Sequence, residues 1–272
     1  MSSMATTHNP GTALVTGAGA GIGRALSLAL AQRGWTVVVT DLRETAAKET
    51  LQALESTGGR GSAYALDVTD ASAWARLIDQ LPETPSLLVN NAGIGGAGEV
   101  RDLSPEHWTP IVDVNLRGVA HGVQAVYPAM AEAGRGAILN IASGAGLCPR
   151  PGMVPYAAAK HAVVGLSTSL RAEAAAHGVR VCVACPGYIA TDILRNSQYV
   201  GVDARTLTER IPIRPMSAQD CARRILRGLD RNRAVIPIGG GVTAEWLLYR
   251  IAPGLVHRLA RIRARAFREA RR

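Results

Sequence analysis

The chain has 272 residues, of which 47% are hydrophobic and 19% are charged, and its formal net charge is +9 at neutral pH. A chain of this length and composition can bury a full core and is typical of one α/β domain. No apolar stretch is long enough to cross a bilayer, and the first ten residues lack the basic start and apolar centre of a secretory signal. We therefore expect a cytoplasmic protein.

The positive charge is concentrated in the tail. Residues 243–272 carry a net charge of +6, which leaves +3 for the rest of the chain and argues against a nucleic-acid-binding domain. The four cysteines are too few for a disulfide framework, and no His and Cys cluster has metal-ligand spacing, so we expect no metal. Cys182 and Cys185 are three apart in an expected strand, so they should face opposite sides of a sheet.

Short aliphatic runs alternate with helical patterns along the chain, which predicts buried parallel strands joined by helices. Asp70, Ser104 and Ser217 are expected to cap helices, and Pro105 fits the first turn of one. Right-handed crossovers then give an α/β fold of the Rossmann type, a doubly wound parallel sheet of about seven strands with helices on both faces. The expected strands are residues 12–16, 35–41, 62–67, 86–90, 136–142, 179–185 and 233–238.

A glycine-rich turn follows the first expected strand. The motif Thr16-Gly17-x-x-x-Gly21-x-Gly23 lies between the apolar run 13–15 and a helical pattern that starts near Arg24. Glycine lets the backbone approach a pyrophosphate closely, and the N-terminus of the following helix favours its negative charge. The turn therefore predicts a phosphate-binding site.

Tyr156 and Lys160 are four residues apart in an expected helix, so their side chains lie one above the other on one face. Bringing a tyrosine pKa from about 10 to near neutrality requires roughly 4 kcal/mol, about what an ammonium at about 4 Å supplies at an effective dielectric near 20. Lys160 and Lys48 are the only lysines among 30 basic residues. Lysine at position 160 therefore indicates a site that needs a compact ammonium.

These motifs make the chain similar to the short-chain dehydrogenase/reductase family, in its short single-domain branch. The resemblance runs from about residue 11 to about residue 240. We expect a flexible N-terminus at 1–10, one Rossmann-fold dehydrogenase domain at 11–242 and a basic amphipathic helical extension at 243–272. The motifs that carry the resemblance are Thr16-Gly17-x-x-x-Gly21-x-Gly23, Asp67, Asn90-Asn91-Ala92-Gly93, Asn115, Ser143, Tyr156-x-x-x-Lys160, Pro186-Gly187 and Thr191.

The resemblance implies hydride transfer between a secondary alcohol or ketone and a nicotinamide cofactor. Tyr156 would be the general acid/base, and Ser143 would hold the substrate oxygen. Lys160 would lower the pKa of Tyr156 and bind the nicotinamide ribose, and Asn115 would order a water that links the lysine to solvent. The expected cofactor contacts are Gly17, Gly19, Gly21, Ile22, Gly23, Asp41, Asp67, Val68, Asn91, Ala92, Gly93, Tyr156, Lys160, Pro186, Gly187, Ile189 and Thr191.

Asp41 bears on which nicotinamide is used. A carboxylate at the end of the second strand can accept hydrogen bonds from the adenosine ribose and would repel the extra phosphate of NADP. The sequence therefore favours NAD. Arg24 and Arg43 lie close by and keep an NADPH-dependent ketone reductase as the alternative.

The segments expected around the substrate are mostly apolar, which favours a hydrophobic alcohol or ketone. A solvated Arg150 is favoured over one that pairs with an acidic substrate group. A hydrolase is excluded because Ser143 lacks the glycine two residues before it and no histidine lies in a catalytic motif. A non-catalytic, cofactor-sensing protein on the same fold predicts the loss of a catalytic residue, yet all four are present. The expected substrate contacts are Ser143, Cys148, Met153, Tyr156, Tyr188 and Leu194.

The tail predicts an amphipathic basic helix, because Leu255, Leu259, Ile262 and Ala266 recur at helical spacing among arginines. The favoured interpretation is that it packs on the protein's own sheet edge or on a neighbouring subunit. The alternative is that it lies on an anionic membrane surface. We also expect a homodimer or homotetramer.

Overall fold

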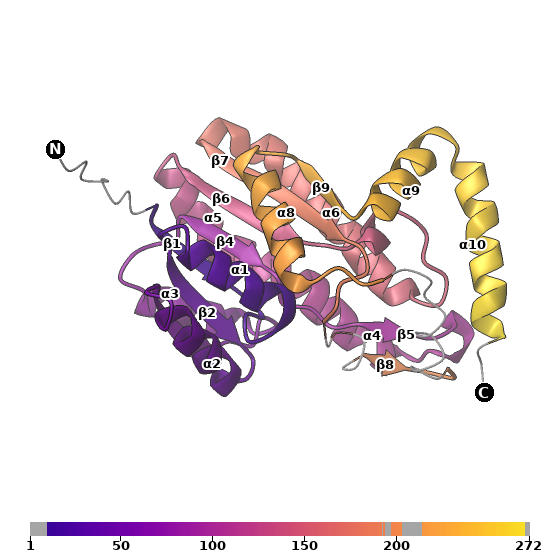
Figure 1. Ribbon diagram of the computed structural model, residues 1–272, viewed down its shortest axis with the longest axis horizontal. Helices are drawn as coiled ribbons and strands as arrows, with labels where there is room; N and C mark the ends of the chain where they lie inside the picture. The colour runs from indigo at the N-terminus through magenta and orange to yellow at the C-terminus, as the bar shows by residue number, and fades with distance from the viewer. Residues whose placement is uncertain (1–9, 192, 194–196, 203–213, 270–272) are drawn as a thin grey trace.

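A seven-stranded sheet, parallel throughout, forms the centre of the protein in this computed structural model, which describes residues 10–191, 193, 197–202 and 214–269. The predicted doubly wound fold is confirmed (Figure 1). The strands are β1 (Thr12–Val15), β2 (Thr36–Asp41), β3 (Arg60–Ala65), β4 (Leu87–Asn90), β6 (Gly136–Ile141), β7 (Val179–Pro186) and β9 (Val235–Ile238). Their spatial order is β3-β2-β1-β4-β6-β7-β9.

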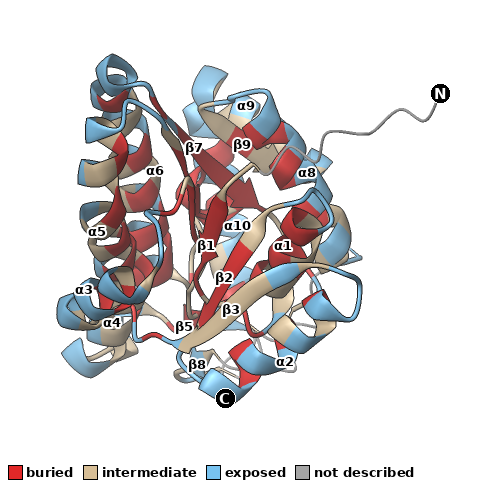
Figure 2. Cartoon of the chain, turned by 90° about the vertical axis from the view of Figure 1, so that its left-hand side faces the viewer, coloured by how far each residue is buried: buried red, intermediate tan, exposed pale blue. Residues whose placement is uncertain are grey.

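Helices cover both faces of this sheet, and the buried side chains lie between the layers (Figure 2). One face is covered by α1 (Gly21–Ala31), α2 (Glu44–Glu55) and α8 (Ala218–Asp230), and the other by α3 (Ala71–Gln80), α5 (Gly118–Glu132) and α6 (Val154–Ala174). Strands β1 and β4 are buried along their whole length, as apolar runs in a two-sided sheet should be.

The strand order reverses between β1 and β4, because β1 pairs with β2 on one side and with β4 on the other. Ligands of open α/β sheets bind at such a switch point, beyond the carboxyl ends of the strands. Asp70 and Ser217 cap α3 and α8 as predicted: their side chains accept hydrogen bonds from Ser72 N at 2.8 Å and from Asp220 N at 3.0 Å.

Two local features were not predicted from the sequence. Strands β5 (Gly96–Ala97) and β8 (Gln198–Tyr199) form a separate parallel pair, because segments about a hundred residues apart meet there. A π-helical turn at Asp113–Arg117 joins α4 (Pro105–Val112) to α5. Such turns are frequent at functional sites, and this one contains Asn115.

A chain of buried polar side chains ties the sheet to α6. The amide of Asn90 in β4 donates to Asn140 Oδ1 in β6 at 2.9 Å, and the amide of Asn140 donates to Ser167 Oγ in α6 at 2.9 Å. Ser167 in turn donates to the carbonyl of Val163. These bonds fix α6 along and around its axis relative to β6, and α6 carries Tyr156 and Lys160.

All four cysteines are free and buried. Cys182 and Cys185 lie in different apolar clusters, on opposite faces of β7, as predicted from their spacing. Burial raises the pKa of every one of these thiols, to about 11 for Cys148 and to about 12 for Cys185 and Cys221.

Two helices follow the sheet at the C-terminal end, α9 (Gly240–Ile251) and α10 (Pro253–Arg268). They lie at the end of the molecule opposite α2 and α3 (Figure 1). Across the described ranges, no helix combines the length and the apolar character that a membrane span needs. Residues 1–9, most of the segment expected to be flexible, lie outside the described residues.

The buried polar chain gives a test of what holds α6 in place. Asn140→Ala leaves the amide of Asn90 and the hydroxyl of Ser167 without this partner, at a cost of about 1–3 kcal/mol for an unsatisfied buried group. We expect urea denaturation to show a stability loss of at least about 2 kcal/mol, against a small change for the exposed control Gln80→Ala. Equal midpoints for the two variants would contradict this role.

Candidate active site

The glycine turn after β1 packs so closely on neighbouring backbone that it requires glycine. Gly17 and Gly21 have φ angles of +59° and +55°, which glycine adopts without strain. A Cβ on Gly17 would lie 2.7 Å from Ala92 Cα, and one on Gly23 would lie 2.3 Å from Gly17 O. Ala20 at the N-cap of α1 provides no side-chain cap, and the first turn has no acid. The backbone N–H groups at Gly21–Gly23 are therefore suited to an anion such as a pyrophosphate.

Thr16 and Asn91 bind the glycine turn to the end of β4. Thr16 Oγ1 accepts hydrogen bonds from the backbone N–H groups of Asn91 and Ala92, each at 3.0 Å. The amide of Asn91 donates to Thr16 O at 2.9 Å and to Gly17 O at 3.0 Å. Asn91 and Ala92 therefore shape the turn through these hydrogen bonds, and Thr16 was not among the expected contacts.

Asp41 lies where the second strand meets the glycine turn. Its carboxylate accepts hydrogen bonds from the backbone N–H of Gly19 at 3.0 Å and of Arg43 at 3.1 Å. A Cβ on Gly19 would lie 2.8 Å from Asp41 Oδ2, so the glycine allows this contact. The structure thus fixes a negative charge beside the turn, on a half-buried residue that a ligand can reach.

Asp67 and Val68 follow β3 on the same edge. Asp67 Oδ1 accepts from the backbone N–H and the hydroxyl of Thr69, at 2.9 and 2.7 Å. Val68 is buried and packs against Gly118, where a Cβ would lie 2.7 Å from Val68 Cγ2. These contacts hold the loop in place and leave Asp67 exposed.

Tyr156 and Lys160 lie in the first two turns of α6, and both are buried, with 8% and 3% of their surfaces exposed. Lys160 Nζ donates to the backbone carbonyl of Ile141 at 2.9 Å and lies 5.8 Å from the centre of the Tyr156 ring. Burial lowers the pKa of Lys160 to about 8, because desolvation disfavours the ammonium. The ammonium still predominates at neutral pH.

The expected lowering of the Tyr156 pKa is not found in this structure. Burial raises the pKa of the phenol above 10.0, and a side-chain hydrogen bond with Ser143 opposes that rise. An ammonium about 4 Å from the phenol was expected, whereas Lys160 Nζ donates to the carbonyl of Ile141 and lies 5.8 Å from the centre of the Tyr156 ring. Desolvation of the phenolate therefore outweighs the hydrogen bond with Ser143.

Ser143 follows β6 and begins a short 3₁₀ turn, Gly144–Gly146. Its hydroxyl oxygen accepts a hydrogen bond from the N–H of Ala145 at 3.1 Å, which fixes the side chain, and its hydroxyl remains able to bond with Tyr156. Gly146 packs on α6, where a Cβ would lie 2.5 Å from Lys160 O. The serine turn and the tyrosine helix are therefore held close together.

Asn115 lies in the π-helical turn and is completely buried. Its amide donates to the carbonyls of Ile94 and Ile111, both at 2.9 Å, while its Oδ1 has no partner within the described part of the chain. A Cβ on Gly93 would lie 2.8 Å from Asn115 Oδ1 and 3.4 Å from Lys160 Nζ. The glycine thus leaves an opening between an unpaired acceptor and an ammonium, which suits a bridging water.

The remaining expected cofactor contacts lie at the end of β7, in the loop that follows it and at the start of α1. Gly187 N donates to Ile238 O at 3.0 Å, which holds the turn after Pro186 against β9. Ile189 is buried in the core, and Thr191 lies over the glycine turn, because a Cβ on Gly21 would lie 3.1 Å from Thr191 Cγ2. Ile22 is half-buried at the start of α1. All of these positions share the carboxyl edge of the sheet.

The expected substrate contacts are brought together only in part. Met153 packs with Tyr156 in an apolar cluster that also contains Ile94, and Tyr188 lies close enough to Tyr199 to affect its pKa. Cys148 was expected to contact the substrate, but it is only 1% exposed. It packs in a different apolar cluster, under α9, and so belongs to the core. Cys148 lies in a loop, where no hydrophobic periodicity indicates which side chains are buried. Leu194 lies outside the described residues.

Glu245, in α9, was not predicted from the sequence as part of the site. Its carboxylate forms a bidentate ion pair with Arg150 at 2.8 and 2.9 Å and also binds Arg263 of α10. Burial raises the pKa of Glu245, but the hydrogen bonds and charges of the two arginines outweigh this and lower it. Arg150 is therefore an ion-pair partner rather than a solvated arginine. The available signal was that Glu245 is the only acid in residues 243–268.

Comparison with known proteins agrees with this geometry. A family model described as short chain dehydrogenase matches residues 11–199. Cyclohexanol dehydrogenase of Acinetobacter sp. is 37% identical over 195 residues, which cover 70% of this chain and 78% of that protein. A crystal structure of a short chain dehydrogenase/reductase from Burkholderia phymatum in complex with NAD matches with a TM-score of 0.83 and 29% identity, covering 91% of this chain and 95% of that one.

A longer relative is also similar. The protein named "Probable oxidoreductase EphD" of Mycobacterium tuberculosis is 32% identical over 262 residues, which cover 92% of this chain but 44% of that protein. The chain therefore spans less than half the length of this relative. The family model and the relatives show that the chain belongs to the short-chain dehydrogenase/reductase family, as its motifs predicted. Within the described residues, no cluster of His, Cys, Asp and Glu is suited to a metal ion.

Lys160 allows a test that separates stability from activity. A pKa lowered from 10.5 to about 8 corresponds to roughly 3 kcal/mol of unfavourable charge burial at neutral pH. Lys160→Met removes that charge, so we expect its thermal midpoint to rise by at least about 2 °C while turnover is lost. Lys48→Met, at the only other lysine, which is exposed, is the control.

The pH dependence provides the second measurement. Between pH 8 and pH 10.5 the unfolded wild-type chain still binds the proton that the folded chain has lost, so stability from this group rises with pH in that window. Lys160→Met should lack this rise and Lys48→Met should keep it. A lower thermal midpoint for Lys160→Met would show that the buried ammonium stabilises the fold.

Proposed function

We propose that this chain is an NAD-dependent oxidoreductase that interconverts a secondary alcohol and a ketone on a hydrophobic substrate. The observation that carries the proposal is the meeting of Ser143, Tyr156, Lys160 and Asn115 at one edge of the sheet, beside the glycine turn. Each side chain is fixed by a hydrogen bond or by burial. A non-catalytic protein on this fold would have no need to keep all four.

The roles follow from the chemistry of each group. When bound, the nicotinamide would accept a hydride from an alcohol carbon or return one to a ketone. Tyr156 removes the hydroxyl proton in one direction and supplies it in the other. Ser143 holds the substrate oxygen against Tyr156, with its own orientation fixed by the N–H of Ala145. The positive charge of Lys160 favours the phenolate form of Tyr156 when the phenol loses its proton.

Asn115 and Lys160 together form a path for proton transfer between the site and solvent. The unpaired Oδ1 of Asn115 and the ammonium of Lys160 both border the space beside Gly93. A water in that space would accept a proton from Lys160 and pass it toward solvent. Because burial keeps Tyr156 protonated at neutral pH, ketone reduction should be favoured there, and alcohol oxidation should accelerate as the pH rises.

The binding residues fit a dinucleotide. Gly17, Gly21 and Gly23 allow the tight turn that precedes the N-terminus of α1, where a pyrophosphate would bind the free N–H groups. Asp41 can accept hydrogen bonds from the adenosine ribose. The fixed charge of Asp41 disfavours an extra phosphate at that position, which supports NAD over NADP. The Burkholderia phymatum relative with the same fold was crystallised in complex with NAD.

The surroundings of Tyr156 indicate the kind of substrate. Tyr156 packs with Ile111, Ala145 and Ala157, and Ile94 and Met153 lie half-buried against this cluster. These groups suit a carbon skeleton with a single polar oxygen directed at Ser143 and Tyr156. Cyclohexanol is a suitable first probe, because a relative is named for it.

Tyr156→Phe tests the chemical step. It should reduce turnover by at least about 10²-fold, the lower end of what a positioned acid/base supplies, while NADH binding is retained because the glycine turn is unchanged. The assay is a panel of secondary alcohols and ketones, followed by the absorbance of the reduced nicotinamide. Tyr127→Phe is the matched control, since that buried hydroxyl has no partner in the described part of the chain. Near-normal turnover by Tyr156→Phe would refute the mechanism.

Asp41→Asn tests the choice of cofactor. The amide oxygen can still accept the hydrogen bond of Gly19, whereas the bond from Arg43 to the other carboxylate oxygen is lost together with the negative charge. We expect the ratio of kcat/KM for NAD over NADP to fall by at least about tenfold, since a charge interaction of 1.4 kcal/mol corresponds to that factor. Glu44→Gln removes a nearby charge and is the control. A wild-type enzyme that prefers NADP would favour the ketone reductase and assign the phosphate to Arg24 or Arg43.

A further inference from the structure

Helices α9 and α10 form a C-terminal hairpin, residues 240–268, whose inner face is well anchored. Val256, Ala260 and Phe267 of α10 are buried, with 1%, 7% and 9% of their surfaces exposed. The ring of Phe267 packs on Gly152, where a Cβ would lie 2.4 Å from Phe267 Cε2. The hairpin therefore contacts the loop that precedes Tyr156, on the substrate side of the site.

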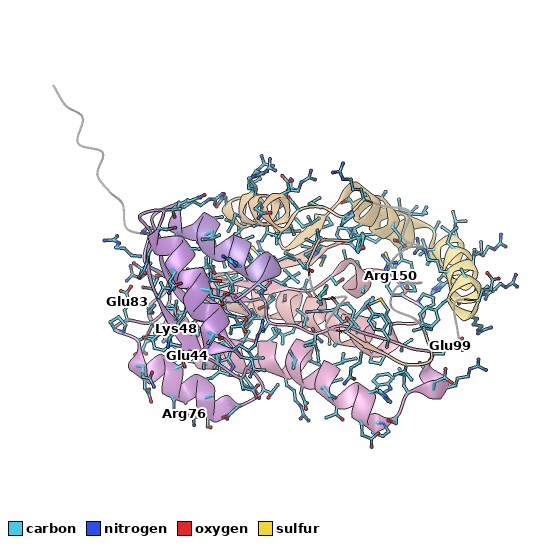
Figure 3. The ribbon with its side chains drawn as sticks, turned by 60° about the horizontal axis from the view of Figure 1, so that its bottom comes forward. Glu44, Lys48, Arg76, Glu83, Glu99 and Arg150 are labelled. Atoms are coloured by element: carbon cyan, nitrogen blue, oxygen red, sulfur yellow. The ribbon has the colours of Figure 1, made fainter. Side chains whose placement is uncertain are left out.

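Ion pairs fix the orientation of the hairpin. Glu245 of α9 pairs with Arg150 of the loop after β6 and with Arg263 of α10, and Arg268 near the end of α10 pairs with Glu99 at 2.6 Å. Figure 3 labels Arg150 and Glu99 on the side of the molecule that carries the hairpin. These ion pairs hold the C-terminal half of α10, and Val256 is buried near its start, so the outer face of the helix has a defined direction.

That outer face is unexpectedly apolar. Leu255, Leu259 and Ile262, which we name the apolar stripe, are 48%, 39% and 62% exposed. At about 100° per residue, the stripe lies roughly a third of a turn around α10 from its buried face. Leu247 and Ile251 of α9 are 47% and 83% exposed.

The exposed apolar side chains gather at this one end of the molecule. The described residues include eight large apolar side chains that are exposed, and five of them are in the hairpin. Val100 and Val154 are two more, next to Glu99 and close to Gly152, which the hairpin contacts. Only Leu42 lies elsewhere. An apolar concentration of this kind marks an interaction surface.

Arginines border the apolar stripe on its solvent side. On the helix circumference, Arg258 and Arg265 are the neighbours of the apolar stripe. Arg261 comes after them and lies farther from the stripe. No carboxylate among the described residues pairs with these three, in contrast to Arg263 and Arg268. The face thus combines exposed leucine and isoleucine with unneutralised positive charge.

We propose that the C-terminal hairpin docks this protein on a membrane surface rich in anionic lipid, with the apolar stripe entering the acyl boundary and Arg258, Arg261 and Arg265 at the headgroups. Charge complementarity favours this partner. A basic amphipathic helix binds an anionic membrane surface through burial of its apolar side chains and through attraction of its arginines to the headgroups. If the proposed function holds, docking brings the substrate side of the site to lipid-soluble alcohols and ketones. The docking itself does not depend on that activity.

A second copy of the chain fits this face less well. In a two-fold contact the same patch meets itself, so the arginines of one copy would face those of the other. Like charges brought together across an interface disfavour binding. Anionic headgroups neutralise these arginines while the stripe is buried.

Vesicle sedimentation of the full chain tests the proposal, with phosphatidylcholine vesicles that contain about 30% phosphatidylserine, and with phosphatidylcholine alone. We expect binding to the anionic vesicles at low salt, at least tenfold weaker binding to the neutral ones, and loss of binding as salt shortens the screening length. Either Leu255→Gln with Leu259→Gln, or Arg258→Gln with Arg265→Gln, should weaken binding at least tenfold. Leu42→Gln, at the exposed apolar residue outside this surface, is the matched control.

Thermal midpoints establish that each variant is folded, which the exposure of these side chains predicts. Absence of sedimentation of the wild-type chain with anionic vesicles at low salt would overturn the proposal. So would equal binding to both kinds of vesicle. A change of molar mass in analytical ultracentrifugation for the stripe variants, without any loss of vesicle binding, would instead assign the face to contact between copies of the chain.

Discussion

The site depends on keeping one ammonium group charged in the interior. Lys160 is almost completely buried, and its ammonium donates to the carbonyl of Ile141. Isolated buried charges are very unfavourable, so the surrounding residues are constrained. Gly93 leaves space beside Nζ, and Gly146 allows the serine turn to reach α6. The end of β6, the turn after β4 and the start of α6 are thus adapted to the same group. A side chain in place of either glycine would displace Lys160 although the lysine itself is unchanged.

Much of this arrangement could be predicted from local sequence patterns. The seven strands read as buried aliphatic runs because a parallel sheet covered on both faces admits little else. Once their order is that of a doubly wound sheet, residues that directly follow strands must share one edge, as Gly17, Asp41, Asn91 and Ser143 do. The four-residue spacing of Tyr156 and Lys160 likewise survives in the structure, because both lie in one regular helix.

What could not be predicted depends on contacts between distant segments. The pairing of β5 with β8 leaves no periodic pattern in strands of two residues. Glu245 joins Arg150 and Arg263 only because α9 and α10 fold back over the loop that follows β6. The pKa of Tyr156 depends on how far α6 is covered, which helical spacing does not contain. The hydrogen bond from Lys160 to the carbonyl of Ile141 is similarly a matter of packing.

The burial of every cysteine has a practical consequence. Thiol reagents attack the thiolate, and burial both hides the sulfur atoms and raises their pKa values above the neutral range. The folded protein should thus be almost inert to maleimides, and its thiols should become reactive as the chain opens. Their labelling rate then reports unfolding directly. A single cysteine introduced on the surface would be the one rapidly labelled position, so a fluorophore or spin label could be placed there without removing any native residue.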